Sequence, residues 1–482
     1  MTLRLHNTLT KNIDTLVPLA GDAVRMYSCG PTVYDHAHIG NLSAFVMADT
    51  LRRVVSANGY SVTHVMNFTD IDDKTIRRSR TEYPEMEPLE ALRASTQVYT
   101  DIFLEDMKAI GNDVDALTFI RAADDATIEG MRQLITTLHD QGFAYIAEDG
   151  IYFSIEAYQA SGKTYGQLVE ITANNTSAAR IANDEYDKES VHDFALWKAE
   201  KPGEPAWDFD LGGHQLRGRP GWHIECSVMS QQGLGLPFDI HTGGIDLAFP
   251  HHENEIAQST AGSDNPTYAS LFVHNEHILV DGRKMSKSLG NFYTLKDLRD
   301  RGVDPLAFRL LVLQSHYRSQ TNFSFDNVEA ATNRLRNWRA VAVLRHQIHG
   351  TIRDKKSTDD DIHSPLAAKQ AIIEALSADL DTPAALRIID ETFDALPLGN
   401  IDLIHHGSLT SLIEAIDQVL GLELIASTPD IDEDAKRLII ERERARDAKD
   451  WPRSDALRDQ LQREYSISLR DTAHGSIWAY SS

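Results

Sequence analysis

The strongest constraint on the fold comes from residues 24–70, where a strand pattern, a glycine-bearing loop, a helical pattern and a second strand pattern follow one another. The strands are expected at residues 24–30, VRMYSCG, and at residues 61–70, SVTHVMNFTD. Apolar residues recur at helical spacing between them, at Leu42, Phe45, Val46, Leu51, Val54 and Val55. This order predicts a βαβ unit of a parallel sheet, with ligands beyond the carboxyl ends of its strands. Asn41 is well suited to cap the helix, whose free N–H groups attract phosphate.

The strand-then-glycine pattern returns at residues 238–249, FDIHTGGIDLAF, and the following HHENEIAQS reads as a helix. Between the two halves the pattern is mixed: residues 145–153 look like a strand, and the polar stretch from residue 171 to residue 190 looks like loop and short strand. Beyond Asn322 the chain is strongly helical, with Thr382 as one helix cap and a break at Pro452. We therefore predict an α/β, Rossmann-like parallel-sheet domain with an insertion, followed by helical C-terminal domains.

Composition limits the class of protein. The 482 residues exceed what one core usually supports, and the net charge of −25 argues against non-specific binding to polyanions. No apolar run is long enough to span a membrane and the N-terminus lacks a signal-peptide pattern, so a cytoplasmic protein is expected. Two cysteines cannot build a disulfide framework, so Cys29 and Cys226 are either buried filler or part of the chemistry.

Two thiolates, an imidazole and a carboxylate are a coherent set of zinc ligands, and the chain offers them at Cys29, Cys226, His251 and Glu255. The spacing of four residues puts His251 and Glu255 on one helical face. On spacing alone, a solvated helix face and two unrelated cysteines are slightly favoured over zinc. A competing register pairs His252 with Glu253 or Glu255.

The second constellation is the loop 281–291, DGRKMSKSLGN. Lys284 and Lys287, flanked by serines and a glycine, present ammonium groups suited to neutralising the charge on a triphosphate. A basic surface loop would have a similar composition, but the order KMSKS is far more specific than a count of charges.

These residues resemble the class I aminoacyl-tRNA synthetases, through HIGN at 38–41, in place of their HIGH signature, and KMSKS at 284–288. Within that class the chain is similar to the cysteinyl-tRNA synthetase family. The segments that carry this similarity follow in order as CGPTVYDHAHIGN, NFTDIDDK, DFALWK, PGWHIECS, DLAFPHHENEIAQS and KMSKSLGNF. The resemblance extends from LRLHNTLT near the N-terminus to DTAHGSIW near the C-terminus, and so covers essentially the whole chain.

The resemblance implies a ligase that activates L-cysteine with ATP and transfers it from cysteinyl-adenylate to the 3′ end of tRNA(Cys). It also implies one zinc ion per chain, held by Cys29, Cys226, His251 and Glu255. An apolar pocket separates near-isosteric substrates by only about 1 to 3 kcal/mol. A zinc ion that bonds a thiolate in preference to a hydroxyl would reject serine directly. Four protein ligands normally close a zinc site, so Glu255 must loosen or the zinc must accept a fifth ligand.

By the same resemblance, further residues receive roles. Those implied for catalysis are His38, Asn41, Lys284 and Lys287. Those implied for ATP, which binds with Mg²⁺, are His38, Gly40, Asn41, Gly244, Asp246 and Lys287. Those implied for cysteine are Cys29, Gly30, Thr69 and Trp222, although ordinary core packing is an equal alternative for Trp222. Two departures from the family pattern are Asn41, where a histidine is usual, and Thr242, where a glycine is usual, which puts doubt on the backbone at the adenosine edge.

The resemblance also implies a division into domains. The two catalytic halves are expected at residues 1–123 and 202–262, with a connective insertion at 124–201 between them. The KMSKS loop and stem contact are expected at 263–324, a helical bundle with a linker at 350–365 is expected at 325–404, and the anticodon-binding domain is expected at 405–482. Residues 436–458 carry eight basic and five acidic side chains, and Trp478 is suited to stacking on an unpaired base. Without the resemblance, a solvated helix face would explain these charges. The expected partners are tRNA(Cys), L-cysteine and ATP, and the expected state is a monomer without a membrane.

Two other functions compete. The first is a ligase that joins activated cysteine to the amine of an amino-sugar, which would share the zinc and nucleotide motifs but has little use for residues 405–482. The second is an RNA-binding protein without turnover, which Asn41 favours and the intact KMSKS order and metal positions oppose. Cysteine-dependent exchange of pyrophosphate with ATP separates an enzyme from a binding module, and charging of tRNA(Cys) separates the two enzymes.

Overall fold

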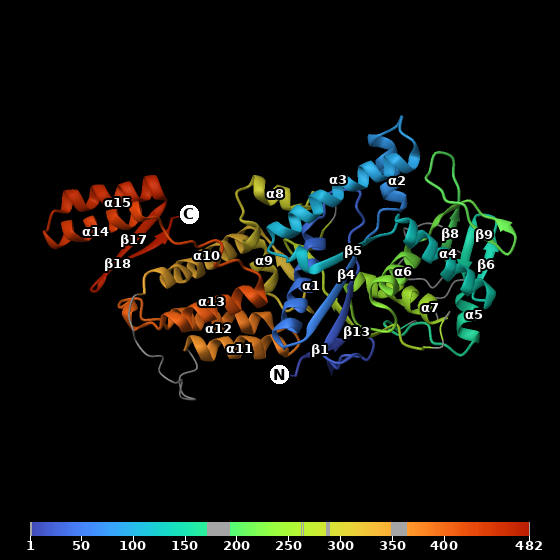
Figure 1. The fold of residues 1–482 in the computed structure, drawn as a ribbon, viewed down its shortest axis with the longest axis horizontal. Helices are drawn as coiled ribbons and strands as arrows, with labels where there is room; N and C mark the ends of the chain where they lie inside the picture. Colours follow the sequence, from blue (N-terminus) through green and yellow to red (C-terminus); the bar gives the residue numbers. More distant parts are fainter. Residues whose placement is uncertain are drawn as a thin grey trace.

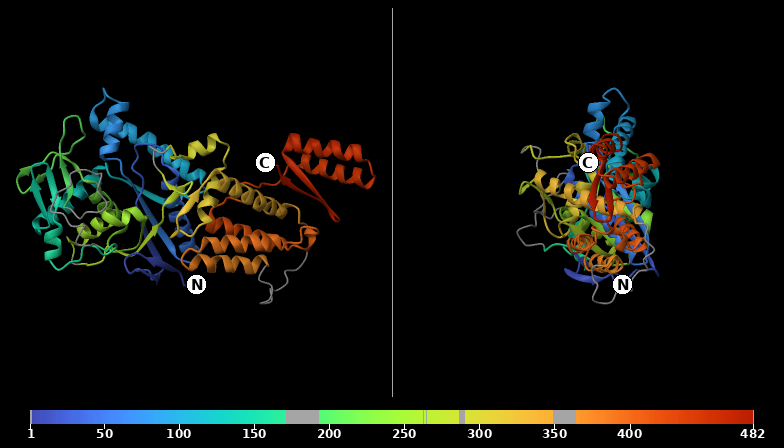
Figure 2. Two further views of the ribbon diagram at one scale, coloured as in Figure 1. Left: turned by 180° about the vertical axis from the view of Figure 1, so that it is seen from behind. Right: turned by 90° about the vertical axis from the view of Figure 1, so that its left-hand side faces the viewer.

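The computed structural model describes residues 2–170, 193–261, 263, 265–285, 290–348 and 364–481. The molecule is elongated (Figure 1). A parallel sheet lies between a smaller sheet at one end and a bundle of helices, and the last two helices with a hairpin form the opposite end (Figure 2).

The central sheet has five parallel strands in the order β13-β12-β3-β4-β5. Its strands are β3 (Ala23–Ser28), β4 (Ser61–Phe68), β5 (Leu117–Arg121), β12 (Phe238–Gly244) and β13 (Ala269–Asn275). Helix α1 (Ile39–Ala57) connects β3 to β4, which confirms the βαβ unit and the parallel sheet. The register pairs Tyr27 of β3 with Val65 of β4 and His241 of β12.

The expected cap of α1 is corrected by one turn. His38, not Asn41, is the N-cap residue, and Asn41 is the third helical residue of a capping box. His38 has extended backbone angles that suit a cap, whereas Asn41 is already helical.

Helices cover both faces of the sheet. Met26 and Met66 point to the face that α1 covers, and Tyr27 and Val65 point to the face covered by α6 (Trp222–Leu234). Alternate residues of a strand point to opposite faces, so both faces of this sheet are buried, the one under α1 and the other under α6. The helices and short elements around it are α2 (Asp73–Glu82), α3 (Pro88–Ala109), η1 (Val114–Ala116), α4 (Asp125–Asp140), and the N-terminal hairpin β1 (Arg4–Asn7) and β2 (Asn12–Thr15).

A four-stranded antiparallel sheet in the order β11-β8-β7-β6 forms most of the region between the two halves of the central sheet. Its strands are β6 (Ala144–Ala147), β7 (Gly150–Phe153), β8 (Phe194–Ala199) and β11 (Gly218–Pro220), accompanied by α5 (Ile155–Ala160), β9 (Asp210–Leu211) and β10 (His214–Gln215). Residues 145–153, expected as one strand, fold into the hairpin of β6 and β7, because Gly150 adopts a positive φ of 152° that allows the turn. The polar stretch 171–190 lies outside the described residues.

After the central sheet the chain becomes helical, as expected. A small sheet of β14 (Ile278–Val280), β15 (Arg283–Lys284) and β16 (Thr321–Phe323) precedes the bundle. The helices that follow the sheet are α8 (Leu295–Asp300), α9 (Pro305–Leu313), α10 (Phe325–Ala342), η6 (Val343–His346), α11 (Pro365–Ser377), α12 (Thr382–Asp394), η7 (Ile401–Leu403) and α13 (His406–Leu420). Asp381, rather than the expected Thr382, caps α12, because its carboxylate accepts the N–H of Ala384.

The C-terminal end is not entirely helical. Helices α14 (Glu433–Asp447) and α15 (Trp451–Tyr465) are followed by the antiparallel hairpin of β17 (Ile467–Thr472) and β18 (Gly475–Tyr480). Pro452 lies in the first turn of α15, which begins at Trp451, rather than within a longer helix. Within the described part of the chain, no helix is long and apolar enough to cross a membrane.

Candidate active site and metal centre

A cleft of about 460 Å³ opens at the carboxyl ends of β3 and β12, where the parallel sheet predicts a ligand site. Nine of the residues expected to act lie along it: Cys29, Gly30, His38, Gly40, Asn41, Trp222, Gly244, Asp246 and Lys284. The loop after β3, the start of α1, the start of α6 and the end of β12 thus meet at one edge of the sheet.

One expected residue, Thr69, is placed differently. Thr69 is 2% exposed and is not part of the cleft lining; its hydroxyl accepts a hydrogen bond from Asn67 Nδ2 at 3.1 Å, and its carbonyl pairs with the N–H of Val33. The threonine therefore supports the loop that follows β3. Lys287 lies outside the described residues.

The metal-ligand set converges. The donor atoms of Cys29, Cys226, His251 and Glu255 all lie within 4.8 Å of one another. Cys29 Sγ is 3.9 Å from Cys226 Sγ and 3.7 Å from Glu255 Oε1, and His251 Nε2 is 3.1 Å from the same carboxylate oxygen. Two thiols, an imidazole and a carboxylate at these separations are the donors that Zn²⁺ takes in proteins, so the residues fit the metal.

Four separate elements bring these donors together. Cys29 follows β3 directly, and Cys226 lies on α6. His251 lies in the short turn η4 (Ala248–His252), which follows η3 (Ile245–Leu247), and Glu255 lies on α7 (Glu253–Ala261). The glycine after Cys29 is required by close approach, because a Cβ at Gly30 would lie 1.7 Å from the carbonyl oxygen of Asn67.

The competing register is also present in the structure. Cys29, His241, His252 and Glu255 form a second group of converging donors, with His252 Nε2 3.3 Å from Cys29 Sγ. The two groups of donors share Cys29 and Glu255, and they differ in their histidines. Nδ1 of His252 is in turn 2.8 Å from Nε2 of His274.

Sequence reasoning missed the groups that hold Glu255. His241 Nε2 lies 2.8 Å from Glu255 Oε2, and the Tyr268 hydroxyl donates to the same oxygen at 2.8 Å. Oε1 therefore faces the thiols and His251, while Oε2 is engaged by other side chains. The only sequence signal was the position of His241 on β12, one strand away from Cys29; Tyr268 gave none.

The cluster sets the protonation of its members. Burial alone would raise the pKa of Cys226, but the hydrogen bond donated by Cys29 and the nearby charge of His251 lower the pKa to about 6. Burial raises the pKa of Cys29 well above its usual value. Burial also opposes the charged form of Glu255, yet the histidines His241 and His251 keep the pKa of Glu255 below its usual value. A cation at this position would thus meet a thiolate and a carboxylate.

Trp222 is half-buried beside the cluster. Its ring stacks on the His251 imidazole, with the ring centroids 4.3 Å apart and the planes at 23°. The indole thus forms a flat apolar wall next to the thiols. His223 Nδ1 lies 2.9 Å from His251 Nδ1, and the His223 ring also lies near the Trp222 ring, with centroids 5.1 Å apart.

The start of α1 forms the opposite wall of the cleft. His38 Nδ1 accepts the N–H of Asn41 at 3.1 Å, and Asn41 Oδ1 accepts the N–H of His38 at 3.3 Å. The His38 ring is packed edge-on against Phe292, with centroids 5.0 Å apart. Lys284, on β15, is exposed at the mouth of the cleft.

The remaining departure, Thr242, lies inside the sheet. It is 1% exposed, its hydroxyl is 2.7 Å from the Ser28 hydroxyl, and its carbonyl accepts the N–H of Cys29. Its side chain therefore ties β12 to β3, and the strand continues in register to Gly244. The doubt over the backbone at this edge is thus removed.

Together, the parallel sheet and the cleft at its edge define the catalytic domain of a class I aminoacyl-tRNA synthetase. The family described as tRNA synthetases class I (C) catalytic domain matches residues 15–333. The family described as Cysteinyl-tRNA ligase anticodon binding domain matches residues 428–472. The chain belongs to the cysteine–tRNA ligase family.

Relatives match over the full length. The cysteine–tRNA ligase of Koribacter versatilis (strain Ellin345) is 39% identical over 519 residues, covering 99% of each chain. That of Synechococcus elongatus (strain ATCC 33912 / PCC 7942 / FACHB-805) is 40% identical over 492 residues, covering 98% of each chain.

Among solved structures, the fold is similar to Mycobacterium tuberculosis methionyl-tRNA synthetase in complex with methionyl-adenylate, with a TM-score of 0.59 at 13% identity over 85% of this chain and 92% of that chain. It is also similar to the Agrobacterium radiobacter K84 LeuRS in a ternary complex with tRNA, with a TM-score of 0.61 at 12% identity over 86% of each chain. These likenesses show the shared fold.

Proposed function

We propose that this chain activates L-cysteine with ATP and transfers it from cysteinyl-adenylate to the 3′ end of tRNA(Cys). The observation that carries the proposal is the convergence of both cysteines, His251 and Glu255 next to a cleft that is lined by Cys29 and by the start of α1. A site for a thiol thus lies next to a helix N-terminus suited to phosphate. The full-length relationship to cysteine–tRNA ligases supports the same reaction.

Cys29, Cys226, His251 and Glu255 would hold Zn²⁺. When bound, zinc supplies a bond to the thiolate of cysteine that the hydroxyl of serine forms poorly. His241 and Tyr268 hold the second oxygen of Glu255, so the carboxylate presents one oxygen to the cluster. This arrangement favours room for a fifth ligand over loosening of Glu255.

The other residues of the cleft orient the substrates. Trp222 walls the thiol pocket, and Gly244 and Asp246 at the end of β12 receive the adenosine. His38 and Asn41 donate toward the α-phosphate as the carboxylate of cysteine displaces pyrophosphate. Lys284 and Lys287 neutralise the charge that develops on the leaving pyrophosphate, with Mg²⁺ bound to the ATP.

The C-terminal end is proposed to bind the anticodon arm. Several of its basic side chains are paired internally; Arg442, for example, forms an ion pair with Asp471. Arg444 and Lys449 have no acidic partner in the described part of the chain, and the Trp451 ring is 57% exposed. Trp451 is therefore the ring suited to stacking on a base. The expectation for Trp478 is wrong in this structure, because its ring is 5% exposed and packs against His346.

We further propose that the protein acts as a cytoplasmic monomer that needs no membrane. A single chain contains both the cleft and the proposed anticodon site, so a second copy is not required to complete either one.

Two measurements test the proposed function. Purified protein should exchange pyrophosphate with ATP only when cysteine is present, and should charge tRNA(Cys). Exchange without charging would instead support the amino-sugar ligase, and absence of both would support a binding protein.

The metal part of the proposal is tested with Cys226→Ser. The wild type should contain one zinc per chain by elemental analysis, and the variant should lose the metal and activate cysteine at least about 100-fold more slowly. Ser259→Ala is a matched control, because Ser259 lies on the same helix as Glu255 and its hydroxyl has no partner within the described chain. A wild type without zinc, or a variant that activates cysteine normally, would refute this assignment.

A further inference from the structure

The C-terminal unit, defined here as residues 428–481, is tied to the helical bundle by hydrogen bonds clustered after α10 and by the packing of Trp478 and Ile477. Three consecutive residues, Arg345, His346 and Gln347, contact both its first residue, Thr428, and its last strand, β18. We call them the docking tripeptide. Arg345 and His346 are the last two residues of η6, which continues helix α10, and Gln347 follows them.

Gln347 holds the last strand by a two-way pair. Its Nε2 donates to the Trp478 carbonyl oxygen at 2.9 Å, and its Oε1 accepts the Trp478 N–H at 2.9 Å. The side-chain amide of Gln347 thus pairs with both the N–H and the carbonyl oxygen of Trp478, as a residue of a neighbouring strand would. The Trp478 ring is buried in a small core with Val343.

Arg345 and His346 hold the beginning of the unit. Arg345 donates to the Thr428 hydroxyl at 2.7 Å and to the Thr428 carbonyl oxygen at 2.6 Å, and His346 Nε2 lies 3.1 Å from the same carbonyl oxygen. Both ends of the C-terminal unit are therefore tied to adjacent residues of the bundle. A connection at two such points fixes an angle as well as a position.

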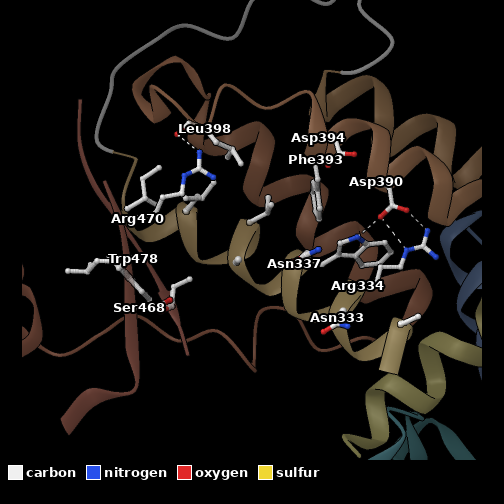
Figure 3. Close-up of a pocket in the computed structure, with 18 of the residues that line it drawn as sticks. Asn333, Arg334, Asn337, Asp390, Phe393, Asp394, Leu398, Ser468, Arg470 and Trp478 are labelled. Carbon is white, nitrogen blue, oxygen red and sulfur yellow. Dashed lines mark hydrogen bonds and ion pairs between the residues drawn. The ribbon is translucent and has the colours of Figure 1, made fainter. Parts of the chain in front are cut away.

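An open cleft flanks the opposite side of this connection. A cavity of about 990 Å³ separates α10 and α12 from the hairpin of β17 and β18 (Figure 3). Asn333 and Asn337 of α10 lie on one wall and Arg470 lies on the other (Figure 3). Among the described side chains that line it, one hydrogen bond crosses the cleft, from Arg470 to the Leu398 carbonyl oxygen at 3.4 Å. Hydrogen bonding on this side thus contributes little to holding the unit in place.

We propose that the docking tripeptide, and Gln347 in particular, is a positioning element that sets the angle of the C-terminal unit so that one tRNA reaches that unit and the catalytic cleft together. The inference rests on the proposed function. Two binding sites reinforce each other only when their separation and orientation allow both to be filled, and the benefit falls as the linkage loosens. Residues 345–347 contact no reacting atom, so they act through the geometry of the unit.

Gln347→Met tests this inference, because methionine keeps the length of the side chain and removes both hydrogen bonds. Loss of these bonds should raise the KM for full-length tRNA(Cys) about tenfold, which is equivalent to about 1.4 kcal/mol. We expect kcat, cysteine-dependent pyrophosphate exchange and the charging of a minihelix that lacks the anticodon arm to be unchanged. The minihelix separates positioning from damage to the catalytic domain.

Two further variants serve as controls for Gln347→Met. Gln347→Glu keeps the acceptor for the Trp478 N–H but sets a carboxylate against the Trp478 carbonyl oxygen, so it should raise the same KM without affecting exchange. Gln370→Ala removes an exposed glutamine on α11 and should change none of these values. Small-angle X-ray scattering of Gln347→Met should show a broader distribution of interatomic distances near the maximum dimension than the wild type shows.

The inference is overturned if Gln347→Met leaves the KM for full-length tRNA unchanged, or if exchange and minihelix charging fall by the same factor as full-length charging. Failure of the proposed function would be distinct, because the wild type itself would then lack exchange or charging. The scattering comparison would still report on the docking tripeptide in that case, and identical curves would count against it.

Discussion

At the scale of single residues, the two carboxylate oxygen atoms of Glu255 have different partners. Oε1 lies 3.1 Å from His251 Nε2, whereas Oε2 receives a hydrogen bond from Tyr268 and lies against His241. A carboxylate held in this way cannot turn to offer both oxygens. The residues that surround a metal ligand thus determine how many positions it fills.

Tyr268→Phe tests this role. Loss of the hydroxyl removes one donor to Glu255 Oε2, so we expect zinc affinity to fall about tenfold, measured by competition with a chromophoric chelator. Tyr145→Phe is the control, because the Tyr145 hydroxyl donates to Asp193 in the insertion sheet, away from the cluster. Unchanged zinc affinity in Tyr268→Phe would show that His241 alone orients the carboxylate.

Asn41 is the second residue with a testable role. It accepts the N–H of His38, while its own N–H donates to the His38 ring, so the two side chains fix each other. Asn41→Ala should lower the free energy of unfolding by about 1 kcal/mol and slow pyrophosphate exchange, because the His38 backbone loses its partner. Asn58→Ala at the other end of α1 should cost similar stability with no effect on exchange. Equal exchange rates in both variants would deny Asn41 a part in the chemistry.

At the scale of elements, helix α1 links the cleft to the bundle through a buried charge cluster. Asp49 Oδ2 accepts from Arg309 at 2.6 Å and from Arg53 at 2.7 Å. Arg309 is 0% exposed and also donates to the carbonyl oxygens of Ile110 and Leu420. One guanidinium on α9 therefore joins α1, the end of α3 and the end of α13.

Asp49→Asn should destabilise the protein. Burial alone would raise the pKa of Asp49, but Arg309, Arg53 and Arg52 hold it far below its usual value. A buried arginine left without its counter-charge costs about 3 kcal/mol, so chemical denaturation at pH 7 should show a loss of this size.

The pH dependence of that loss has a definite sign. Because the folded-state pKa is lowered, the ion pair stabilises the protein above the unfolded value of about 4 and this contribution is lost as the pH falls further. The difference between Asp49→Asn and the wild type should therefore shrink below about pH 4. Asp101→Asn, on the exposed surface of α3, should show no such difference at any pH. A constant difference across pH would mean that packing, not charge, explains the loss.

At the scale of the whole molecule, an acidic protein is proposed to bind a polyanion at one end. The net charge is −25, and many basic side chains of α14 and α15 are neutralised by nearby carboxylates, as Arg453 is by Glu441. Arg444 and Lys449 lack such partners in the part of the chain described. Charges without internal partners are the ones free to contact phosphate.

The salt dependence of tRNA charging tests whether the unpaired basic side chains contact the tRNA. Lys449→Gln should raise the KM for tRNA(Cys) and reduce the slope of log KM against log salt concentration by roughly one phosphate contact. Arg437→Gln is the matched control, since Arg437 is paired with Asp434 on the same helix. Equal slopes for Lys449→Gln and the wild type would place the tRNA elsewhere.

The sequence by itself determined the local pattern and the chemistry that it supplies. Apolar spacing of 3.6 or two residues encodes a helix or a strand, so the βαβ unit, the return at β12 and the helical second half were all predictable. The KMSKS order pointed to the nucleotide loop. The metal set followed from the family resemblance, because spacing alone slightly favoured two unrelated cysteines and a solvated helix face. The hairpin after α15 was missed, because its first strand alternates apolar and polar residues only over the short stretch ISLR before the polar residues of the turn.

Only the tertiary structure decided which distant groups meet. Cys29 and His252 are 223 positions apart and come within 3.3 Å, and nothing in local periodicity encodes that approach. The same holds for Tyr268 at Glu255, and for Trp478, whose ring is buried by contacts with residue 346 rather than left for a base. Long-range contacts depend on how complete elements pack, and the packing is set by the sum of many burials rather than by any one residue.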